Sequence, residues 1–142
     1  MIFDAVSIKA AVVEADERET GERKILNFGH TFGHAFELYL SVKHGFAVAA
    51  GMEIATRYSV IKGYISASEA DRITGLLNKF GLLKEYRIPA SRLEKLVSHD
   101  KKKTGNELHF IFTAGIGKAV SEKVAIKELR DFYSLFLSDK LN

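Results

Sequence analysis

The sequence has 142 residues, of which 46% are hydrophobic and 27% are charged. This length and composition fit one ordinary domain with a hydrophobic core, so we expect residues 1–142 to form a single domain. The chain has no cysteine, which excludes disulfide bonds and thiolate metal sites. No apolar run reaches the roughly 18 residues of a membrane helix, so the sequence predicts no membrane span.

The charge of the chain is weakly positive, with a formal net charge of +3 and a pI near 9.1. Lys and Arg are spread along the sequence instead of being massed in one segment, so we do not expect nucleic-acid binding. Small phosphorylated or carboxylated anions are at least as natural as partners for this charge. The first residues carry acidic side chains and lack the order of a secretory signal, so we expect a cytoplasmic protein.

The first half of the chain predicts three helices. Residues 2–15 carry apolar side chains at helical spacing, and the polar stretch DERETGE follows them. An apolar stripe from 25 to 39 predicts a second helix. After the short connection SVKHG, residues 46–62 are apolar almost all round. This pattern indicates a central helix that is buried on most sides and that Gly63 ends.

The second half predicts shorter elements. Ser66 and Glu69 have the spacing of a capping box at the start of a helix, and another short helix follows Pro89. Residues 108–112 are rich in β-formers and precede the turn sequence TAGIGK, which predicts a hairpin. A last helix is expected over 126–137. The fold class is therefore a mainly α domain of about six or seven helices with one small β-hairpin.

A polar row accompanies the apolar stripe of the second helix. Asn27, His30 and His34 lie at i, i+3 and i+7, so in a continuous helix they point the same way. Gly29 and Gly33 are one turn apart, and each costs about 1 kcal/mol relative to alanine in a helix interior. Two such costs predict that a ligand or another backbone comes close.

His44 follows His34 by ten residues and lies at a helix junction, where a helical hairpin would bring it beside His30. Imidazole is a common zinc ligand, and a catalytic zinc takes three protein ligands and one water or substrate. The sequence offers two ligands and no third. We expect His30, His34 and His44 to cluster around a cleft, although such a histidine pair is also typical of a solvated helix face. A zinc peptidase is excluded because Thr31 stands where the HExxH motif needs glutamate.

Several cations are candidate anion-binding residues. Arg23 can hold a carboxylate with two parallel hydrogen bonds, and Lys9 can act as a movable point charge. Lys9 on an apolar helix is equally typical of a side chain that reaches solvent. Lys101 and Lys102 stand in a basic run before a turn, which fits either a solvated loop or a phosphate-binding one.

Three segments together closely resemble the C-terminal domain of 3-dehydroquinate synthases, namely SIKAAVVEADERETGERKILNFGHTFGHAFE, KHGFAVAAGM and HDKKKTG. The resemblance spans nearly the whole chain. It implies a lyase of the shikimate pathway, and so of aromatic amino acid biosynthesis. Such an enzyme converts 3-deoxy-D-arabino-heptulosonate 7-phosphate to 3-dehydroquinate and phosphate with bound NAD and Zn²⁺ or Co²⁺. NAD oxidises a hydroxyl, phosphate leaves, the ketone is reduced and the ring closes by aldol addition.

The resemblance also implies roles for the histidines. His30 and His44 would be metal ligands. His34 would lie beside the substrate phosphate and assist its departure. A metal that binds the substrate hydroxyl lowers the pKa of that hydroxyl for oxidation and later polarises the ketone.

The remaining implied roles concern the substrate's hydroxyls and anionic groups. Lys9, Arg23 and Asn27 would hold the hydroxyls and the carboxylate, and Lys9 and Asn27 would be catalytic together with the phosphate-binding histidine. Lys102, or its neighbour Lys101, would complete the anion pocket.

Two departures from the family pattern limit these expectations, and the first concerns what precedes this region in the family. The family's NAD-binding domain precedes this region, as does the glutamate that is its third metal ligand. We therefore expect the isolated chain to lack activity and to need an N-terminal NAD-binding domain as its partner; a homodimer is also compatible with the resemblance.

Phe46 stands where the family often has an acidic residue after the HG pair. It leaves open another sugar phosphate cyclase, such as a 2-deoxy-scyllo-inosose synthase, or a metal-dependent alcohol or glycerol dehydrogenase. A non-catalytic helical module that binds a metal or a partner protein is the alternative from another class.

Overall fold

A computed structural model describes residues 1–16, 22–98 and 105–138, with side chains in the second range from Lys24 onward. These residues form six α-helices, a short 3₁₀ helix and one antiparallel pair of strands, which confirms the predicted mainly α class with one hairpin. The elements are α1 (Ile2–Ala15), η1 (Glu22–Asn27), α2 (His30–Leu40), α3 (His44–Ile61), α4 (Ala67–Lys79), α5 (Ala90–Val97), β1 (Glu107–Thr113), β2 (Ala119–Ala125) and α7 (Ile126–Leu137).

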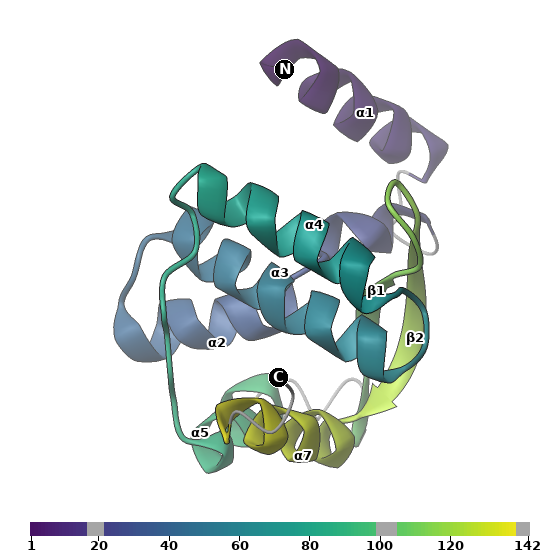
Figure 1. Ribbon diagram of the computed structural model, residues 1–142. Coiled ribbons are helices and arrows are strands. Elements are labelled where there is room, and N and C mark those ends of the chain that lie inside the picture. Colours follow the sequence, from purple (N-terminus) through teal and green to yellow (C-terminus); the bar gives the residue numbers. More distant parts are fainter. Residues whose placement is uncertain (17–21, 99–104, 139–142) are drawn as a thin grey trace.

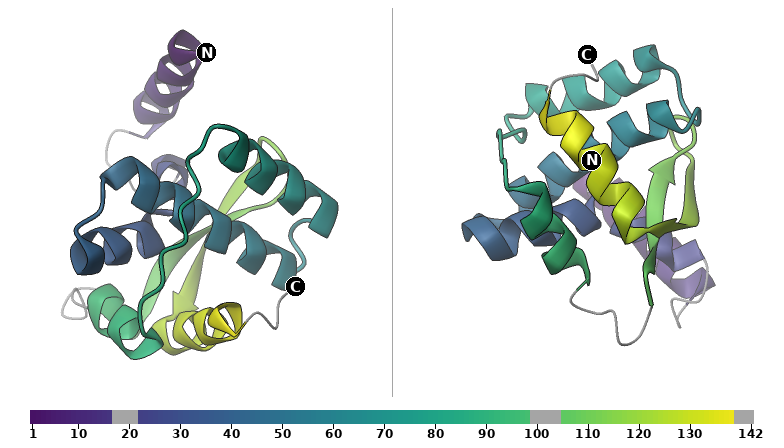
Figure 2. Two further views of the ribbon diagram at one scale, coloured as in Figure 1. Left: turned by 60° about the vertical axis from the view of Figure 1, so that its left-hand side comes forward. Right: turned by 90° about the horizontal axis from the view of Figure 1, so that it is seen from below.

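Helix α3 is the centre of the fold, as its apolar sequence predicts (Figure 1). It contacts α2, α4, β1 and α7, and ten of its 18 residues are buried. Figure 2 shows α5 and α7 together at one end of the molecule and α1 projecting from the rest. None of the described helices is both long and apolar enough to cross a membrane.

An aromatic cluster joins α3 to the hairpin and to α7. The Tyr58 ring stacks on Phe132 with centroids 4.1 Å apart, and it also contacts Phe110 and Phe112 of β1. Its hydroxyl donates a hydrogen bond to the carboxylate of Glu128. Aromatic rings bury large apolar surfaces, and a buried hydroxyl needs a partner. This cluster therefore holds the hairpin and the last helix on α3.

The ends of the central helices follow the predicted caps. After α3, Gly63 has φ +77°, and the amides of Gly63 and Tyr64 bond back to the carbonyls of Val60 and Ser59. This is the Schellman arrangement, in which a left-handed glycine satisfies the last carbonyls. Helix α4 then begins with the predicted capping box between Ser66 and its third helical residue.

The prediction of one continuous helix over 25–39 is wrong at its start. The 3₁₀ helix η1 ends at Asn27, and α2 begins only at His30 with Gly29 as its N-cap at φ +82°. Gly29 therefore ends one element and caps the next, a left-handed conformation that costs glycine little. The polar row from Asn27 to His34 consequently does not lie on a single α-helix.

The paired glycines of this region serve a close contact between backbones, which was one of the two predicted outcomes. A Cβ on Gly33 would lie 2.9 Å from the Cα of Val48, and one on Gly29 would lie 2.7 Å from the amide nitrogen of Met52. On the opposite helix, a Cβ on Gly51 would overlap the carbonyl oxygen of Gly29. Three glycines thus allow α2 and α3 to pack in direct backbone contact.

We predict that Gly51→Ala destabilises the chain by at least about 2 kcal/mol, because overpacking a close contact costs about 1–3 kcal/mol and here both neighbours are backbone. Gly75→Ala is the matched control, because Gly75 lies exposed in α4 with open space around its Cα. The control should gain about 0.5–1 kcal/mol from helix propensity. Urea unfolding followed by circular dichroism measures both, and equal effects of the two substitutions would contradict the close-contact interpretation.

Candidate functional site

The short turn between α2 and α3 brings their histidines together. Ser41 adopts a left-handed conformation with φ +54°, its amide bonds to the carbonyl of Glu37, and α3 begins three residues later at His44. The two helices run antiparallel, since Gly33 lies beside Val48 whereas the earlier Gly29 lies beside the later Met52. His44 therefore returns to the same end of the hairpin as Glu37.

Three imidazoles meet beside this hairpin, which confirms that His30, His34 and His44 cluster. Ring centroids are 5.3 Å apart for His30 and His34, 5.6 Å for His30 and His44, and 6.0 Å for His34 and His44. Two imidazoles on one tetrahedral zinc, with Zn–N bonds of about 2.0–2.1 Å, have centroids roughly 5 Å apart. The spacing of the rings therefore fits a shared metal.

The outer nitrogens of two of these rings already have partners. His30 Nδ1 lies 3.3 Å from the backbone carbonyl of Phe28, and His44 Nδ1 lies 2.9 Å from a carboxylate oxygen of Glu37. Both partners only accept hydrogen bonds, so each ring donates from Nδ1. Nε2 then carries the lone pair on both rings. Metal-bound histidines typically have this arrangement, so the donor set fits Zn²⁺ or Co²⁺.

His34 occupies a different environment from the other two histidines. It borders a pocket of about 240 Å³ between α2, α5 and β1, which Leu96 and His109 also line. Burial, followed by the charge of His30, lowers the pKa of His34 below its ordinary value, and Glu37 acts in the opposite direction. The neutral imidazole is therefore favoured at neutral pH, and it can donate or accept a hydrogen bond.

Glu37 belongs to this site although no sequence argument named it. Ligand atoms of His34, Glu37 and His44 all lie within 4.8 Å of one another, so a second set of possible metal donors overlaps the first. The signal was present in the sequence, because His34 and Glu37 stand at i and i+3 on one helix face. Its link to His44 depended on the turn at Ser41.

Of the predicted substrate-binding residues outside the histidine cluster, the structure describes the side chains of only Lys9 and Asn27. Lys9 is exposed on α1, and we find no hydrogen bond or ion pair between it and the histidines in the part of the chain that the structure describes. Asn27 is exposed at the end of η1. The side chain of Arg23 and all of Lys101 and Lys102 lie outside the described residues.

Phe46, the departure after the HG pair, packs against a cation. The Lys84 ammonium lies 5.6 Å from the centroid of the Phe46 ring. An aromatic face attracts a cation through its quadrupole. Phe46 thus offers Lys84 a weaker form of the attraction that an acidic side chain would offer there.

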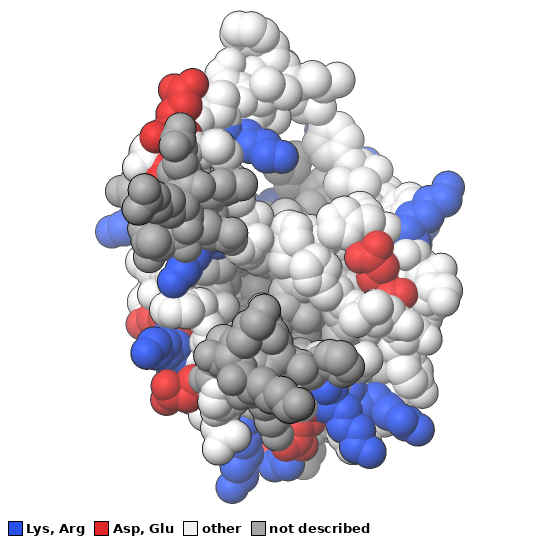
Figure 3. Space-filling model, turned by 180° about the vertical axis from the view of Figure 1, so that it is seen from behind, with Lys and Arg blue, Asp and Glu red and all other residues white. Residues whose placement is uncertain are grey.

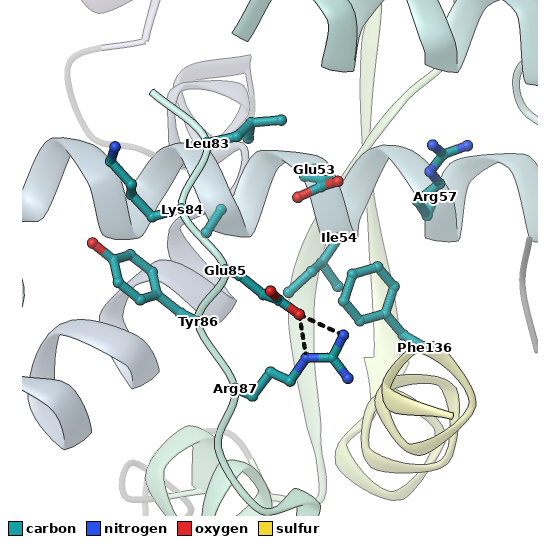
Figure 4. A pocket seen from close by; sticks show the side chains of 10 residues that line it. Glu53, Ile54, Arg57, Leu83, Lys84, Glu85, Tyr86, Arg87 and Phe136 are labelled. Atoms are coloured by element: carbon teal, nitrogen blue, oxygen red, sulfur yellow. Dashed lines mark hydrogen bonds and ion pairs between the residues drawn. The ribbon is translucent and has the colours of Figure 1, made fainter. Parts of the chain in front are cut away.

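Another pocket, of about 340 Å³, lies between α3, residues 83–87 and α7 (Figure 4). Two of its three cations form ion pairs. Arg87 lies 2.6 Å from Glu85, and Arg57 lies 3.3 Å from Asp71. Because no histidine lines this pocket and most of its cations are paired, we do not assign the site to it.

On the face seen from behind, the Lys and Arg residues that the structure describes are interspersed with Asp and Glu (Figure 3). Lys and Arg stand at the edges of this face with Asp and Glu between them, and α1 shows mainly uncharged surface. The described part of this face thus resembles the spread of charge along the sequence.

Comparison of the sequence with known proteins identifies related synthases. The chain is 47% identical over 116 residues to a 3-dehydroquinate synthase of Halorhodospira halophila, covering 79% of this chain and 33% of that protein. It is 41% identical over 133 residues to a 3-dehydroquinate synthase of Pelobacter propionicus, covering 91% and 37% respectively. The chain thus spans about a third of the length of these two relatives.

Comparison of the fold identifies sugar phosphate cyclases. A 2-deoxy-scyllo-inosose synthase, determined with carbaglucose-6-phosphate, NAD⁺ and Co²⁺, matches with a TM-score of 0.78 and 26% identity over 92% of this chain and 39% of its own. A 2-epi-5-epi-valiolone synthase from Streptomyces hygroscopicus, with NAD⁺ and Zn²⁺, matches with a TM-score of 0.79 over 96% of this chain and 39% of its own. At 20% identity the second likeness concerns the fold alone.

A family model described as 3-dehydroquinate synthase C-terminal matches residues 1–103, which include all three clustered histidines and the helical hairpin that carries them. The chain therefore belongs to the 3-dehydroquinate synthase family and corresponds to its C-terminal domain.

Proposed function

We propose that residues 1–142 form one domain of a 3-dehydroquinate synthase and act in the reaction that releases phosphate from 3-deoxy-D-arabino-heptulosonate 7-phosphate. The observation that carries this proposal is the convergence of three imidazoles whose ring centroids lie within 6.0 Å of one another, two of which have Nδ1 beside a hydrogen-bond acceptor. The partner is an NAD-binding domain of the kind that precedes this region in the resembled enzymes. That domain would supply the nicotinamide and a third metal ligand.

In this proposal His30 and His44 hold Zn²⁺ or Co²⁺. The bound metal supplies Lewis acidity, which lowers the pKa of a substrate hydroxyl and polarises a ketone. His34 lies one helical turn from His30 and borders a pocket, so we assign to it the binding of the leaving phosphate, whose departure it would assist by donating a hydrogen bond. Lys9, with Asn27 on the 3₁₀ helix, holds hydroxyl and carboxylate groups.

Two further cations complete the proposed anion site. Arg23 binds the substrate carboxylate and Lys102, or Lys101 beside it, binds phosphate, because fixed cations neutralise both anions most effectively in a partly desolvated site.

A second candidate function is another sugar phosphate cyclase. Two observations favour it, namely the likeness in fold and sequence to a 2-deoxy-scyllo-inosose synthase and the aromatic Phe46 beside Lys84. The two candidates share the metal site and differ in the sugar phosphate. Offering alternative sugar phosphates to this domain joined to an NAD-binding half distinguishes them by the product that forms.

We predict that the 142-residue chain alone does not turn over the keto-acid sugar phosphate. Hydride transfer needs a nicotinamide held against the substrate, and dinucleotide folds hold it on a parallel sheet with a glycine-rich turn. The described strands form only an antiparallel hairpin. Phosphate release should appear when the chain is joined to the N-terminal half of a related synthase. Turnover by the purified chain alone, at the same rate as the joined protein, would refute the prediction.

For the metal, we predict weak zinc binding by the isolated chain, because it offers two of three protein ligands. The loss of one ligand should weaken affinity by ~10-fold or more relative to the joined enzyme, since even outer-shell losses cost about 10–100-fold. His44→Ala should abolish the remaining binding, and His34→Ala should change it little. Calorimetric titration with Zn²⁺ measures these affinities.

Zinc could instead bind the second donor set, which consists of His34, Glu37 and His44. The expected effect of His34→Ala is then reversed. If zinc binds there, His34→Ala abolishes binding while His30→Ala has little effect. That ranking would show that the roles of His30 and His34 must be exchanged. Circular dichroism of each variant verifies that the fold is retained.

The protonation of His34 supplies a further prediction. In an NMR pH titration, His34 should titrate below the ordinary value of about 6.5, because burial and the nearby charge of His30 both disfavour its protonated form. His30→Ala should move the midpoint upward, and inorganic phosphate bound beside the ring should also raise it. A midpoint that neither change moves would contradict the assigned environment and the phosphate role.

A further inference from the structure

Glu37 makes a contact to His44 that the proposed roles do not use. Its carboxylate accepts a hydrogen bond from His44 Nδ1 at 2.9 Å, across the turn that joins α2 to α3. Side chains are 55% exposed for His44 and 39% exposed for Glu37, so the pair is only partly shielded from water. A contact between two half-exposed side chains is a weak contribution to stability. Its larger consequence is for the orientation of the His44 ring.

The chemistry of this contact determines which nitrogen of the His44 ring keeps its lone pair. A carboxylate has no proton to donate, so in the neutral ring the proton resides on Nδ1 and Nε2 is left with its lone pair. The backbone carbonyl of Phe28 has the same effect on His30. A metal held by both rings therefore binds two Nε2 atoms whose opposite nitrogens are anchored, one by main chain and one by a side chain.

We propose that Glu37 is a positioning residue for the metal, which fixes the ring orientation and the Nδ1-protonated tautomer of the ligand His44. This inference rests on the proposed function, since it presupposes that His44 holds the ion. Partners of this kind, which hold the second nitrogen of a metal-bound histidine, commonly contribute to metal affinity. Glu37 is thus a determinant of metal affinity within this chain.

Direct metal binding by Glu37 is the competing role. Its carboxylate lies close enough to His34 and His44 to form a three-donor group with them. In that arrangement the hydrogen bond to Nδ1 would be lost. The 2.9 Å contact, together with the matching contact at His30, favours the positioning role. Glutamine separates the two roles, because its amide oxygen accepts the same hydrogen bond but is a poor replacement for a carboxylate ligand.

The test uses the 142-residue chain with Zn²⁺ and Co²⁺ as probes and compares Glu37→Gln with Glu37→Ala. Glu37→Ala should weaken zinc binding by about 10-fold, the lower end of the range for lost outer-shell partners, because the contact is half exposed. Glu37→Gln should restore most of the affinity and stay within roughly 3-fold of the wild type. The Co²⁺ absorption spectrum should keep its shape in both variants, since the ligands are unchanged. Glu122→Ala, which removes a carboxylate from β2, is the control for charge and folding.

A second measurement reads the tautomer without metal. Nitrogen-15 NMR at pH 8 should show His44 protonated at Nδ1 in the wild type and in Glu37→Gln, and a mixture of tautomers in Glu37→Ala. Equal loss of affinity in both variants with an altered Co²⁺ spectrum would overturn the inference in favour of direct ligation. Unchanged affinity and tautomer in Glu37→Ala would also overturn it. A wild-type chain that binds no zinc would contradict the proposed function instead, and the tautomer comparison would still decide whether Glu37 orients the ring.

Discussion

The close contact between α2 and α3 is the constraint on which the site depends. Side chains normally hold packed helices about 8–10 Å apart, and removing Cβ atoms lets them come closer. Gly29, Gly33 and Gly51 remove them at the crossing, where the Gly29 carbonyl occupies the space of a Cβ on Gly51. The antiparallel register set there carries His44 back to α2, and the three imidazoles meet as a result.

The site lies beside the core and is separate from it. Phe32 and Phe36 of α2 point into the buried cluster with Ile54 of α3, whereas the histidines are partly or fully exposed. The same helix therefore presents an apolar face for folding and a polar face for chemistry, as its 3.6-residue period allows. Because the core does not include the donor atoms, an ion at the site affects local orientation more than the stability of the fold.

The electrostatics of the histidine cluster are compatible first with a bound metal ion and then with an anion beside that ion. Burial and the charge of His30 favour the neutral imidazole of His34, which keeps a lone pair available on that ring. Once a divalent ion is held there, its charge dominates the local field and attracts phosphate or carboxylate. The spacing of the imidazoles is thus compatible with the metal site that we propose from the family relationship.

The sequence by itself determined the family, the helix-rich class, the bounds of α7 and the existence of the hairpin. Those features depend on local periodicity, caps and turn residues, which are all readable within a dozen positions. Only the tertiary structure decided that the second helix begins at His30. The left-handed turn at Gly29 lies against the backbone of Gly51, which comes 22 residues later in the chain. The tertiary structure likewise decided that Glu37 contacts His44, since that contact depends on how α3 returns across α2 after Ser41.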